Sequence, residues 1–272
     1  MDAAARRRRF HDLHAGTALF VMPNPWDVGS AKLLEASGFE ALATTSQGFA
    51  WTLGKLDMKV TRDELVSHVE QLAASVAVPL NVDSERCFPD SPGGVAETVR
   101  LLGEAGAAGC SIEDYDPVTD AIDDASLSVE RVAEAAEVAR SFDPPLVLTG
   151  RAENHLRGVD DLDDTIARLI AYRDAGADCV YAPWLLDLDR IERVVRDVGV
   201  PVNVLAVPDG PPVPELERVG VRRVSTGSLV AGAAFAALER AADELRGDGT
   251  SEYARTRVDT DLVQSAFGPR AG

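Results

Sequence analysis

Cysteine is scarce in this sequence, and the spacing of the few residues present excludes a disulfide framework. The 272 residues include three cysteines, Cys87, Cys110 and Cys179. An odd number of widely separated thiols suits neither paired disulfides nor a zinc knuckle. Cys110 and Cys179 lie in short apolar runs and are expected to be small core residues. A reducing, cytoplasmic location is therefore predicted.

Long apolar runs and basic residues are scarce as well. No apolar run approaches the length that spans a membrane, so no membrane partner is expected. The chain carries 45 acidic residues against 27 basic ones, a formal net charge of -18, which argues against nucleic acid as a partner. The one basic cluster, Arg6–Arg9, is predicted to lie on the solvated face of an N-terminal helix. A nucleic-acid or targeting tag is the alternative.

The overall balance is that of an ordinary globular protein, with 46% hydrophobic and 26% charged residues. Eight short segments rich in apolar and β-branched residues indicate buried strands. They are residues 18–23, 39–46, 78–85, 108–114, 145–153, 179–184, 201–206 and 222–228.

Helical patterns separate these strands. In residues 61–76, Leu65, Val69 and Leu72 recur at intervals of three and four, and residues 128–142 have a similar pattern. Several helical segments end in glycine, where a left-handed cap is expected before the next strand.

Buried strands that alternate with helices favour a parallel sheet, and eight such units favour an α/β fold of the (β/α)8 TIM barrel type. A doubly wound open sheet is the alternative, but no Gly-rich dinucleotide fingerprint follows the first strand. We predict a single barrel domain over residues 1–272, with an extra N-terminal helix at about 1–15 and a C-terminal extension at about 248–272.

Polar residues concentrate where the predicted strands end. In a TIM barrel these carboxyl ends form the catalytic face, so the residues are expected to lie close together. They are Thr45, Ser46, Gln47, Gly48, Asp83, Glu85, Glu113, Asp114, Arg151, Glu153, Asn154, Asn203, Ser225 and Thr226.

Three acids of this set, Asp83, Glu85 and Glu113, would repel one another at the barrel mouth unless a cation neutralised them. Mg²⁺ is the predicted cofactor, because it prefers oxygen ligands and keeps several waters. Arg151 brings to the same face a planar guanidinium suited to a carboxylate, which predicts an anionic, oxygen-rich substrate. The alternative is structural, with the acids capping helices or pairing with Arg86 and Arg151.

Several dispersed motifs give the chain a resemblance to the isocitrate lyase and phosphoenolpyruvate mutase superfamily, over about residues 10–245. The motifs, in order, are NPWDVGSAKLLEASGFEALATTSQG, GKLD, VDSE, SIED, TGRAEN, GADCVYAPW, PVNVL and RRVSTGS. The resemblance implies a barrel whose last helix is often exchanged with a neighbouring subunit, so a homo-oligomer, dimer or tetramer, is expected.

The resemblance also assigns roles to residues. It implies Mg²⁺ on Asp83, with Glu85 and Glu113 close by through water, although Glu85 stands where relatives usually have a second Asp. It implies a substrate-binding set of Ser46, Gln47, Gly48, Arg151 and Asn203. Its catalytic set is Asp57, on a gating loop at residues 49–59, together with Arg151 and Glu113.

What the superfamily implies chemically is a small 2-oxo carboxylate that reacts through a pyruvate-enolate-like intermediate. The members that cleave isocitrate or methylisocitrate carry a Lys-Lys-Cys-Gly-His loop after the fourth strand. Here that region reads DYDPVTDAIDDASL, without Cys, His or Lys, and Cys87 is not expected to replace the missing thiol. His155 is left open as a titrating group near the substrate.

The predicted function is therefore a Mg²⁺-dependent carbon–carbon lyase or decarboxylase, resembling oxaloacetate decarboxylase-like members of the superfamily. A phosphonomutase or P–C bond-cleaving enzyme is one alternative. A non-catalytic protein that binds a 2-oxo acid is the other.

Overall fold

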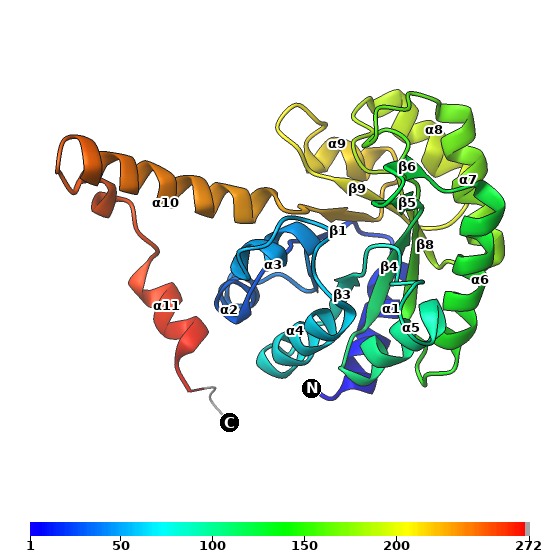
Figure 1. The fold of residues 1–272 in the computed structure, drawn as a ribbon, viewed down its shortest axis with the longest axis horizontal. Coiled ribbons are helices and arrows are strands. Elements are labelled where there is room, and N and C mark those ends of the chain that lie inside the picture. Colours follow the sequence, from blue (N-terminus) through cyan, green and yellow to red (C-terminus); the bar gives the residue numbers. More distant parts are fainter. Residues whose placement is uncertain (270–272) are drawn as a thin grey trace.

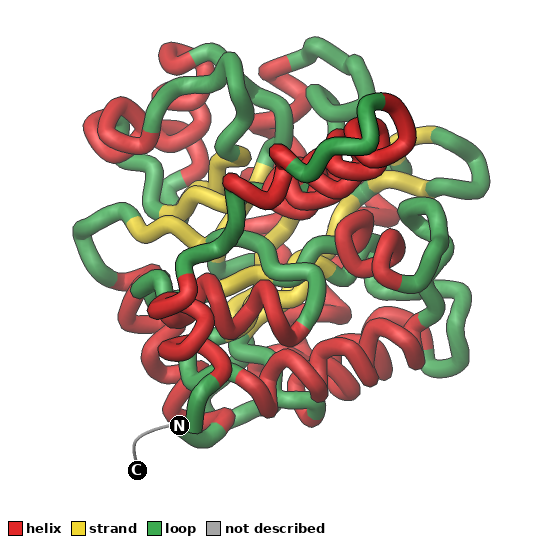
Figure 2. The backbone as a smooth tube through the Cα atoms, turned by 90° about the vertical axis from the view of Figure 1, so that its left-hand side faces the viewer, coloured by secondary structure: helices red, strands yellow, loops and turns green. Residues whose placement is uncertain are grey.

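The strands close into the barrel that the sequence predicts. The computed structural model describes residues 1–269; residues 270–272, at the end of the predicted C-terminal extension, lie outside that part. Within it, eight parallel strands form one sheet in the order β1-β10-β9-β8-β7-β4-β3-β2, enclosed by helices (Figure 2). Between β2 and β1, the two end strands of this order, the Ala43 amide donates to the Pro23 carbonyl at 3.0 Å. The predicted (β/α)8 TIM barrel is confirmed.

Each strand of the barrel lies inside one of the segments predicted from the sequence. The strands are β1 (Phe20–Met22), β2 (Leu42–Ala43), β3 (Leu80–Asp83), β4 (Gly109–Glu113), β7 (Val147–Arg151), β8 (Cys179–Tyr181), β9 (Val202–Leu205) and β10 (Arg223–Ser225).

Helices follow the strands along the chain and cover the outside of the sheet (Figure 1). The longest of them begin at residues whose side chains cap the helix. In α4 (Arg62–Ser75), for example, Thr61 and Glu64 form a reciprocal capping box. Gly106 and Gly176, at φ of 100° and 117°, provide the left-handed residues predicted at helix ends. The covering helices are α2 (Val28–Ala36), α3 (Ser46–Thr52), α4 (Arg62–Ser75), α5 (Gly94–Glu104), α6 (Ala125–Arg140), α7 (Leu162–Ala175), α8 (Leu188–Val198) and α9 (Val213–Arg218).

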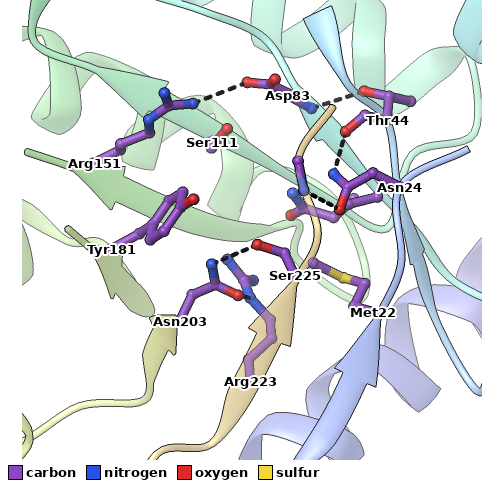
Figure 3. A pocket seen from close by; sticks show the side chains of 13 residues that line it. Met22, Asn24, Thr44, Asp83, Ser111, Arg151, Tyr181, Asn203, Arg223 and Ser225 are labelled. Carbon is purple, nitrogen blue, oxygen red and sulfur yellow. Dashed lines mark hydrogen bonds and ion pairs between the residues drawn. The ribbon is translucent and has the colours of Figure 1, made fainter. Parts of the chain in front are cut away.

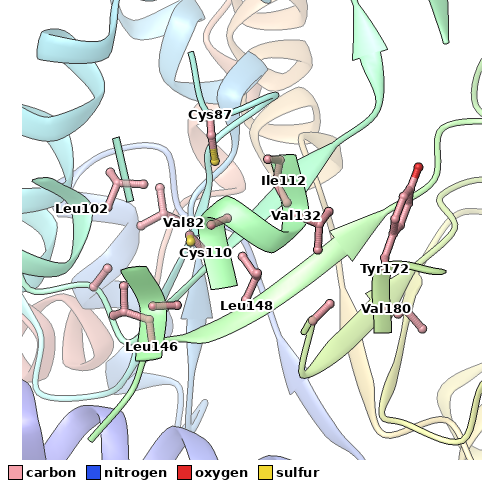
Figure 4. Packing of buried hydrophobic residues seen from close by; sticks show 14 of the residues in the cluster. Val82, Cys87, Leu102, Cys110, Ile112, Val132, Leu146, Leu148, Tyr172 and Val180 are labelled. Atoms are coloured by element: carbon pink, nitrogen blue, oxygen red, sulfur yellow. The ribbon is translucent and has the colours of Figure 1, made fainter. Parts of the chain in front are cut away.

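Side chains alternate along the strands between the helix layer and the barrel axis. Val82, Cys110, Leu148 and Val180 pack outward against buried helix residues such as Leu102 (Figure 4). Near the carboxyl end of the barrel, polar residues of the same strands, such as Asp83, Ser111 and Arg151, line its inside. The period-two alternation of strands thus places the apolar core outside the sheet and the polar chemistry within it.

Helix α1 (Ala3–Ala15) closes the amino-terminal end of the barrel, where Phe10 packs against His14 and Phe20. The prediction that the arginine run is solvated is wrong for Arg6 and Arg7, which are buried. The Arg6 guanidinium donates to the carbonyls of Ala73 and Val76, which end α4 without helical partners. Burial of an arginine whose fork satisfies free carbonyls cannot be predicted from sequence spacing.

A short antiparallel hairpin, β5 (Tyr115–Asp116) and β6 (Ala121–Ile122), fills the loop after β4. The sequence did not predict it. The hairpin occupies the place where thiol-dependent relatives were expected to carry their catalytic loop. Asp116 of the hairpin and Asp123, the residue after it, pair with Arg86 at 2.7 and 3.2 Å. Arg86 therefore does not neutralise the acids at the end of β3.

The C-terminal helix α10 (Leu229–Gly247) extends away from the barrel (Figure 1). Ala231 is its one buried residue, whereas Leu238 and Leu245 are 66% and 51% exposed. A turn, η1 (Glu252–Arg255), and helix α11 (Thr260–Phe267) follow, and α11 lies against α2. Among residues 1–269 no helix combines the length and the apolar character needed to cross a membrane.

Candidate active site

The strand register brings the predicted site residues to one end of the barrel. Asp83 is the Cα partner of Ser111, and Glu113 is the partner of Arg151, so the last residues of β3, β4 and β7 lie side by side. All of them occupy the inward positions of the alternation. Asp83 and Arg151 accordingly point toward each other and form an ion pair beside the cavity (Figure 3).

Asp83 is held by the chain that follows β2. Its Oδ2 accepts a hydrogen bond from the Ser46 amide at 3.0 Å, and its own amide donates to Thr44 Oγ1 at 2.9 Å. Thr45 caps α3 through the Gly48 amide. A methyl group at Gly48 would lie 2.5 Å from Thr45 Cγ2, so this turn needs glycine for close packing. The predicted carboxylate-binding stretch is therefore built directly onto Asp83.

Arg151 bridges three acids at the centre of the site. Its Nη1 lies 3.1 Å from Glu113 Oε2 and 3.5 Å from Asp83 Oδ1, and its Nε donates to Glu153 Oε1. Its guanidinium carbon also lies 5.4 Å from the centroid of the Tyr181 ring. The structural alternative is thus correct in part, because Arg151 does balance these acids. It nevertheless lines the cavities described below.

The site holds more acid than Arg151 can neutralise. Burial, then the charges of Asp83 and Asp57, raise the pKa of Glu85 to about 8. Burial and the nearby Asp83 likewise raise the pKa of Asp57. Burial raises the pKa of Glu113 although Arg151 opposes that rise. Neighbouring buried carboxyl groups whose pKa values are all raised form an environment suited to a bound cation.

The acids fit a Mg²⁺ ion that is held mainly through water. In residues 1–269 no three His, Cys, Asp or Glu side chains converge as a ready-made ligand set. Mg²⁺ does not require one, since it commonly takes one or two carboxylates and keeps several waters. Asp57 Oδ1 is buried without a hydrogen-bond partner, so it is able to accept a hydrogen bond from a water molecule bound to a cation. Asp83, Glu85 and Glu113 are the residues that would hold the ion.

Two connected cavities share Asp83, Arg151, Tyr181 and Gly227. The inner cavity runs down the barrel axis to a buried arginine, Arg223 (Figure 3). The outer cavity, of about 380 Å³, opens to solvent. Its polar wall includes Ser46, Gln47, Asp57, Asp83, Arg151, Arg157, Thr226 and Ser228, and its apolar wall includes Leu156, Pro183, Trp184, Leu205 and Leu229.

The structure therefore separates the predicted site residues into groups. Ser46, Gln47, Asp57, Asp83 and Arg151 line the outer cavity, whereas Glu85, Glu113 and Gly48 are buried beside it.

Asn203 lines only the inner cavity. Its Oδ1 accepts from Arg223 Nε at 2.9 Å, and its Nδ2 donates to Ser225 Oγ at 2.9 Å. Its amide is thus oriented by the barrel rather than free for a ligand.

Two other candidates lie away from the chemistry. His155 faces a separate cavity with Asp160, Trp184 and Arg190, and burial lowers its pKa. Cys87 is fully buried, and its Sγ lies 3.3 Å from Ser84 Oγ. Burial raises the pKa of the Cys87 thiol to about 12, so it carries no thiolate at neutral pH.

Sequence reasoning missed two residues of the outer cavity. Arg157 lies six positions after Arg151, in a stretch that reads as a loop, and only the fold turns it toward the same space. Trp184 ends the motif GADCVYAPW, and neither its left-handed φ of 67° nor the exposure of its side chain was predicted. In the sequence, the available signals were a second arginine a few residues after one predicted strand and a tryptophan at the end of another.

Comparison with known proteins places these features in a family. A sequence model described as phosphoenolpyruvate phosphomutase matches residues 10–246. A crystal structure from Burkholderia cenocepacia, with the provisional description "lyase/mutase", has a TM-score of 0.94 and 46% identity, covering 98% of each chain. An uncharacterized protein of Mycobacterium tuberculosis is 37% identical over 86% of this chain and 87% of its own length.

Two relatives with named activities are more distant. Oxaloacetate decarboxylase of Paraburkholderia xenovorans is 29% identical over 98% of this chain and 91% of its own. The 2-methylisocitrate lyase of Salmonella typhimurium is 29% identical over 82% of this chain and 78% of its own.

Proposed function

Because the chain belongs to the phosphoenolpyruvate phosphomutase family, within a superfamily of lyases and mutases, we propose that it is a Mg²⁺-dependent carbon–carbon lyase or decarboxylase. Its substrate is a small 2-oxo carboxylate that reacts through a pyruvate-enolate-like intermediate. The observation that carries the proposal is the acid cluster of Asp57, Asp83 and Glu85 beside Arg151, at the cavity where the strands end.

The charge of this cluster suits a reaction that develops an enolate. Asp83, Glu85 and Glu113 would hold Mg²⁺, and the ion would supply the Lewis acidity and positive charge that stabilise an enolate. Arg151 orients the anionic substrate with its planar fork. The Ser46–Gly48 turn, packed on Asp83, binds the substrate carboxylate. Fixing both ends of a small acid holds it in a reactive geometry.

Asp57 is the proposed proton-carrying group. Burial and the neighbouring Asp83 raise its pKa, so it retains a proton more readily than an exposed carboxyl does. Of residues 49–59, the predicted gating loop, Asp57 lines the cavity, and residues 49–52 form the end of α3. Closure of this segment excludes water, so that Asp57 can protonate the enolate carbon at the end of the reaction.

The missing thiol favours decarboxylation or simple lyase chemistry over methylisocitrate cleavage. The hairpin β5–β6 stands where the thiol-dependent members are expected to carry their catalytic loop, and Cys87 is buried in contact with Ser84. The similarity to 2-methylisocitrate lyase therefore supports the superfamily chemistry rather than that substrate.

We also propose that α10 packs against a second copy of this chain in a homo-oligomer. Its exposed Leu238 and Leu245 have no cover in residues 1–269, and no helix after β10 covers that strand. Light scattering on the purified protein and on Leu238→Asp tests this: the wild type is expected to be a dimer or tetramer and the variant smaller. A wild-type monomer contradicts it.

The proposed reaction is tested by following pyruvate release from oxaloacetate with Mg²⁺, above the rate of the metal alone. Asp83→Ala and Arg151→Ala should lose turnover, whereas Asp189→Ala, an exposed acid on α8, should not. No release by the wild type contradicts decarboxylase activity. Phosphorus NMR on phosphonates then tests P–C chemistry, and ligand-induced stabilisation without turnover would indicate a binding protein.

A further inference from the structure

Arg157 offers the outer cavity a second cationic group that the proposed chemistry does not use. It lines the same cavity as Arg151, and its side chain is 31% exposed. Of its five N–H donors, Nε bonds to Glu153 Oε2 at 3.3 Å, and the described part of the chain gives its Nη groups no hydrogen-bond partner. A guanidinium with free donors in a substrate cavity is suited to an anion.

This guanidinium is held in place before any ligand arrives. Its carbon lies 3.3 Å from the centroid of the Tyr115 ring, a stacked cation–π contact. Tyr115 is itself fixed by a 2.6 Å hydrogen bond from its hydroxyl to Asp120 Oδ1, across the β5–β6 hairpin. Glu153, which is fully buried, tethers Nε from the other side. Such a preorganised fork loses little side-chain freedom when it binds.

The two guanidinium groups differ in the number of their acidic partners. Glu153 accepts from both Arg151 and Arg157, so one carboxylate is shared by two guanidinium groups. Arg151 is further engaged by Glu113 and Asp83, whereas Arg157 makes no other ion pair within residues 1–269. Arg157 therefore has fewer acidic partners than Arg151 and keeps its Nη donors for a ligand.

The apolar wall lies in the same cavity as the two arginines. Leu156, Trp184 and Leu205 contribute to it. A ligand that uses the whole cavity therefore has a metal-binding acid at one end, a short hydrocarbon segment, and a second acid at the other.

We propose that Arg157 determines specificity by pairing with a second, distal acidic group of the substrate. The inference rests on the proposed function, because it takes the 2-oxo acid head to lie at Asp83 and Arg151. It narrows the substrate class to 2-oxo acids that carry another carboxylate.

Binding of matched acids in the presence of Mg²⁺ tests the inference by calorimetry. The pairs are oxaloacetate with 2-oxobutyrate, 2-oxoglutarate with 2-oxovalerate, and 2-oxoadipate with 2-oxohexanoate, each pair equal in chain length. At one chain length or more, the wild type should bind the diacid at least about tenfold more tightly than its partner. Arg157→Gln should abolish that difference and leave the Kd of the monoacid unchanged.

Two further variants separate recognition from structural damage. Arg157→Lys keeps the charge without the fork and should retain part of the preference. Arg190→Gln removes an arginine of the neighbouring cavity, which pairs with Asp160, and should retain all of it. A variant with weakened monoacid binding and a lowered melting temperature would show a structural role instead.

The outcomes distinguish the inference from the function on which it rests. If monoacids bind but no diacid is preferred, or if Arg157→Gln weakens both members of a pair equally, the role of Arg157 is refuted and the proposed function stands. If the wild type binds none of the six acids with Mg²⁺, the proposed 2-oxo acid site itself is refuted.

Discussion

Replacing Glu85 by glutamine should stabilise the metal-free protein, and more so as the pH rises. Glu85 is 8% exposed, and burial with the charges of Asp83 and Asp57 raises its pKa from an ordinary 4.5 to about 8. A folded-state pKa above the unfolded value means that the fold keeps the proton. The contribution of Glu85 to the free energy of unfolding is then fully present below pH 4.5 and is lost as the pH rises through 8.

The size of the effect follows from the pKa. One pKa unit corresponds to about 1.36 kcal/mol, so ionised Glu85 costs the fold about 3 kcal/mol at pH 7 and between about 4 and 5 kcal/mol near pH 8.5. Near pH 5 the cost is below about 1 kcal/mol. The glutamine side chain of Glu85→Gln has the same shape and no charge, so the substitution removes this cost without leaving a cavity.

Urea unfolding with EDTA, at about pH 5, 7 and 8.5, measures the difference between the two proteins. Added Mg²⁺ should then stabilise the wild type more than Glu85→Gln, because the ion binds the folded state through the ionised acid. Asp189→Asn is the matched control, since Asp189 is exposed on α8. A stability difference that does not change with pH would refute the charge argument.

Three other substitutions test separate features of the molecule. Gly48→Ala places a methyl group 2.5 Å from Thr45 Cγ2. Urea unfolding should show that the variant loses about 1–3 kcal/mol of stability, and kinetics should show at least a tenfold loss of kcat/KM. Unchanged values of both would contradict the close packing. Cys87→Ala should leave turnover within about twofold, because the thiol is buried and protonated, so a large loss would restore it as a catalytic group. Arg6→Ala frees two carbonyls at the end of α4, among them that of Ala73, and should cost about 1–3 kcal/mol of stability with turnover unchanged; a variant as stable as the wild type would show that the buried bonds contribute nothing.

The positions of the strands and of their polar ends follow from the sequence because two simple rules apply. Buried parallel strands are short apolar runs, and inward side chains alternate, so Asp83, Glu113 and Arg151 had to meet once the barrel closed. The polar ends were recognisable as a site for the same reason. Neither rule needs knowledge of loop conformation.

What sequence reasoning could not predict depends on tertiary contacts. Arg6 is buried because two carbonyls at the end of a distant helix accept its protons. Arg157 enters the cavity because Tyr115, on a hairpin with no clear strand pattern, supports it. The helical periodicity of α10 does not show that this helix extends away from its own barrel. Each depends on neighbours far apart in the chain.

Exchange of the methyl protons of pyruvate in D2O tests the central claim most directly, because it detects enolate formation without knowledge of the fragment that leaves. With Mg²⁺ the wild type should exchange these protons, by proton NMR, faster than the metal alone, and Asp83→Asn should not. Exchange at the rate of the metal alone would contradict an enolate-forming site at the carboxyl ends of these strands.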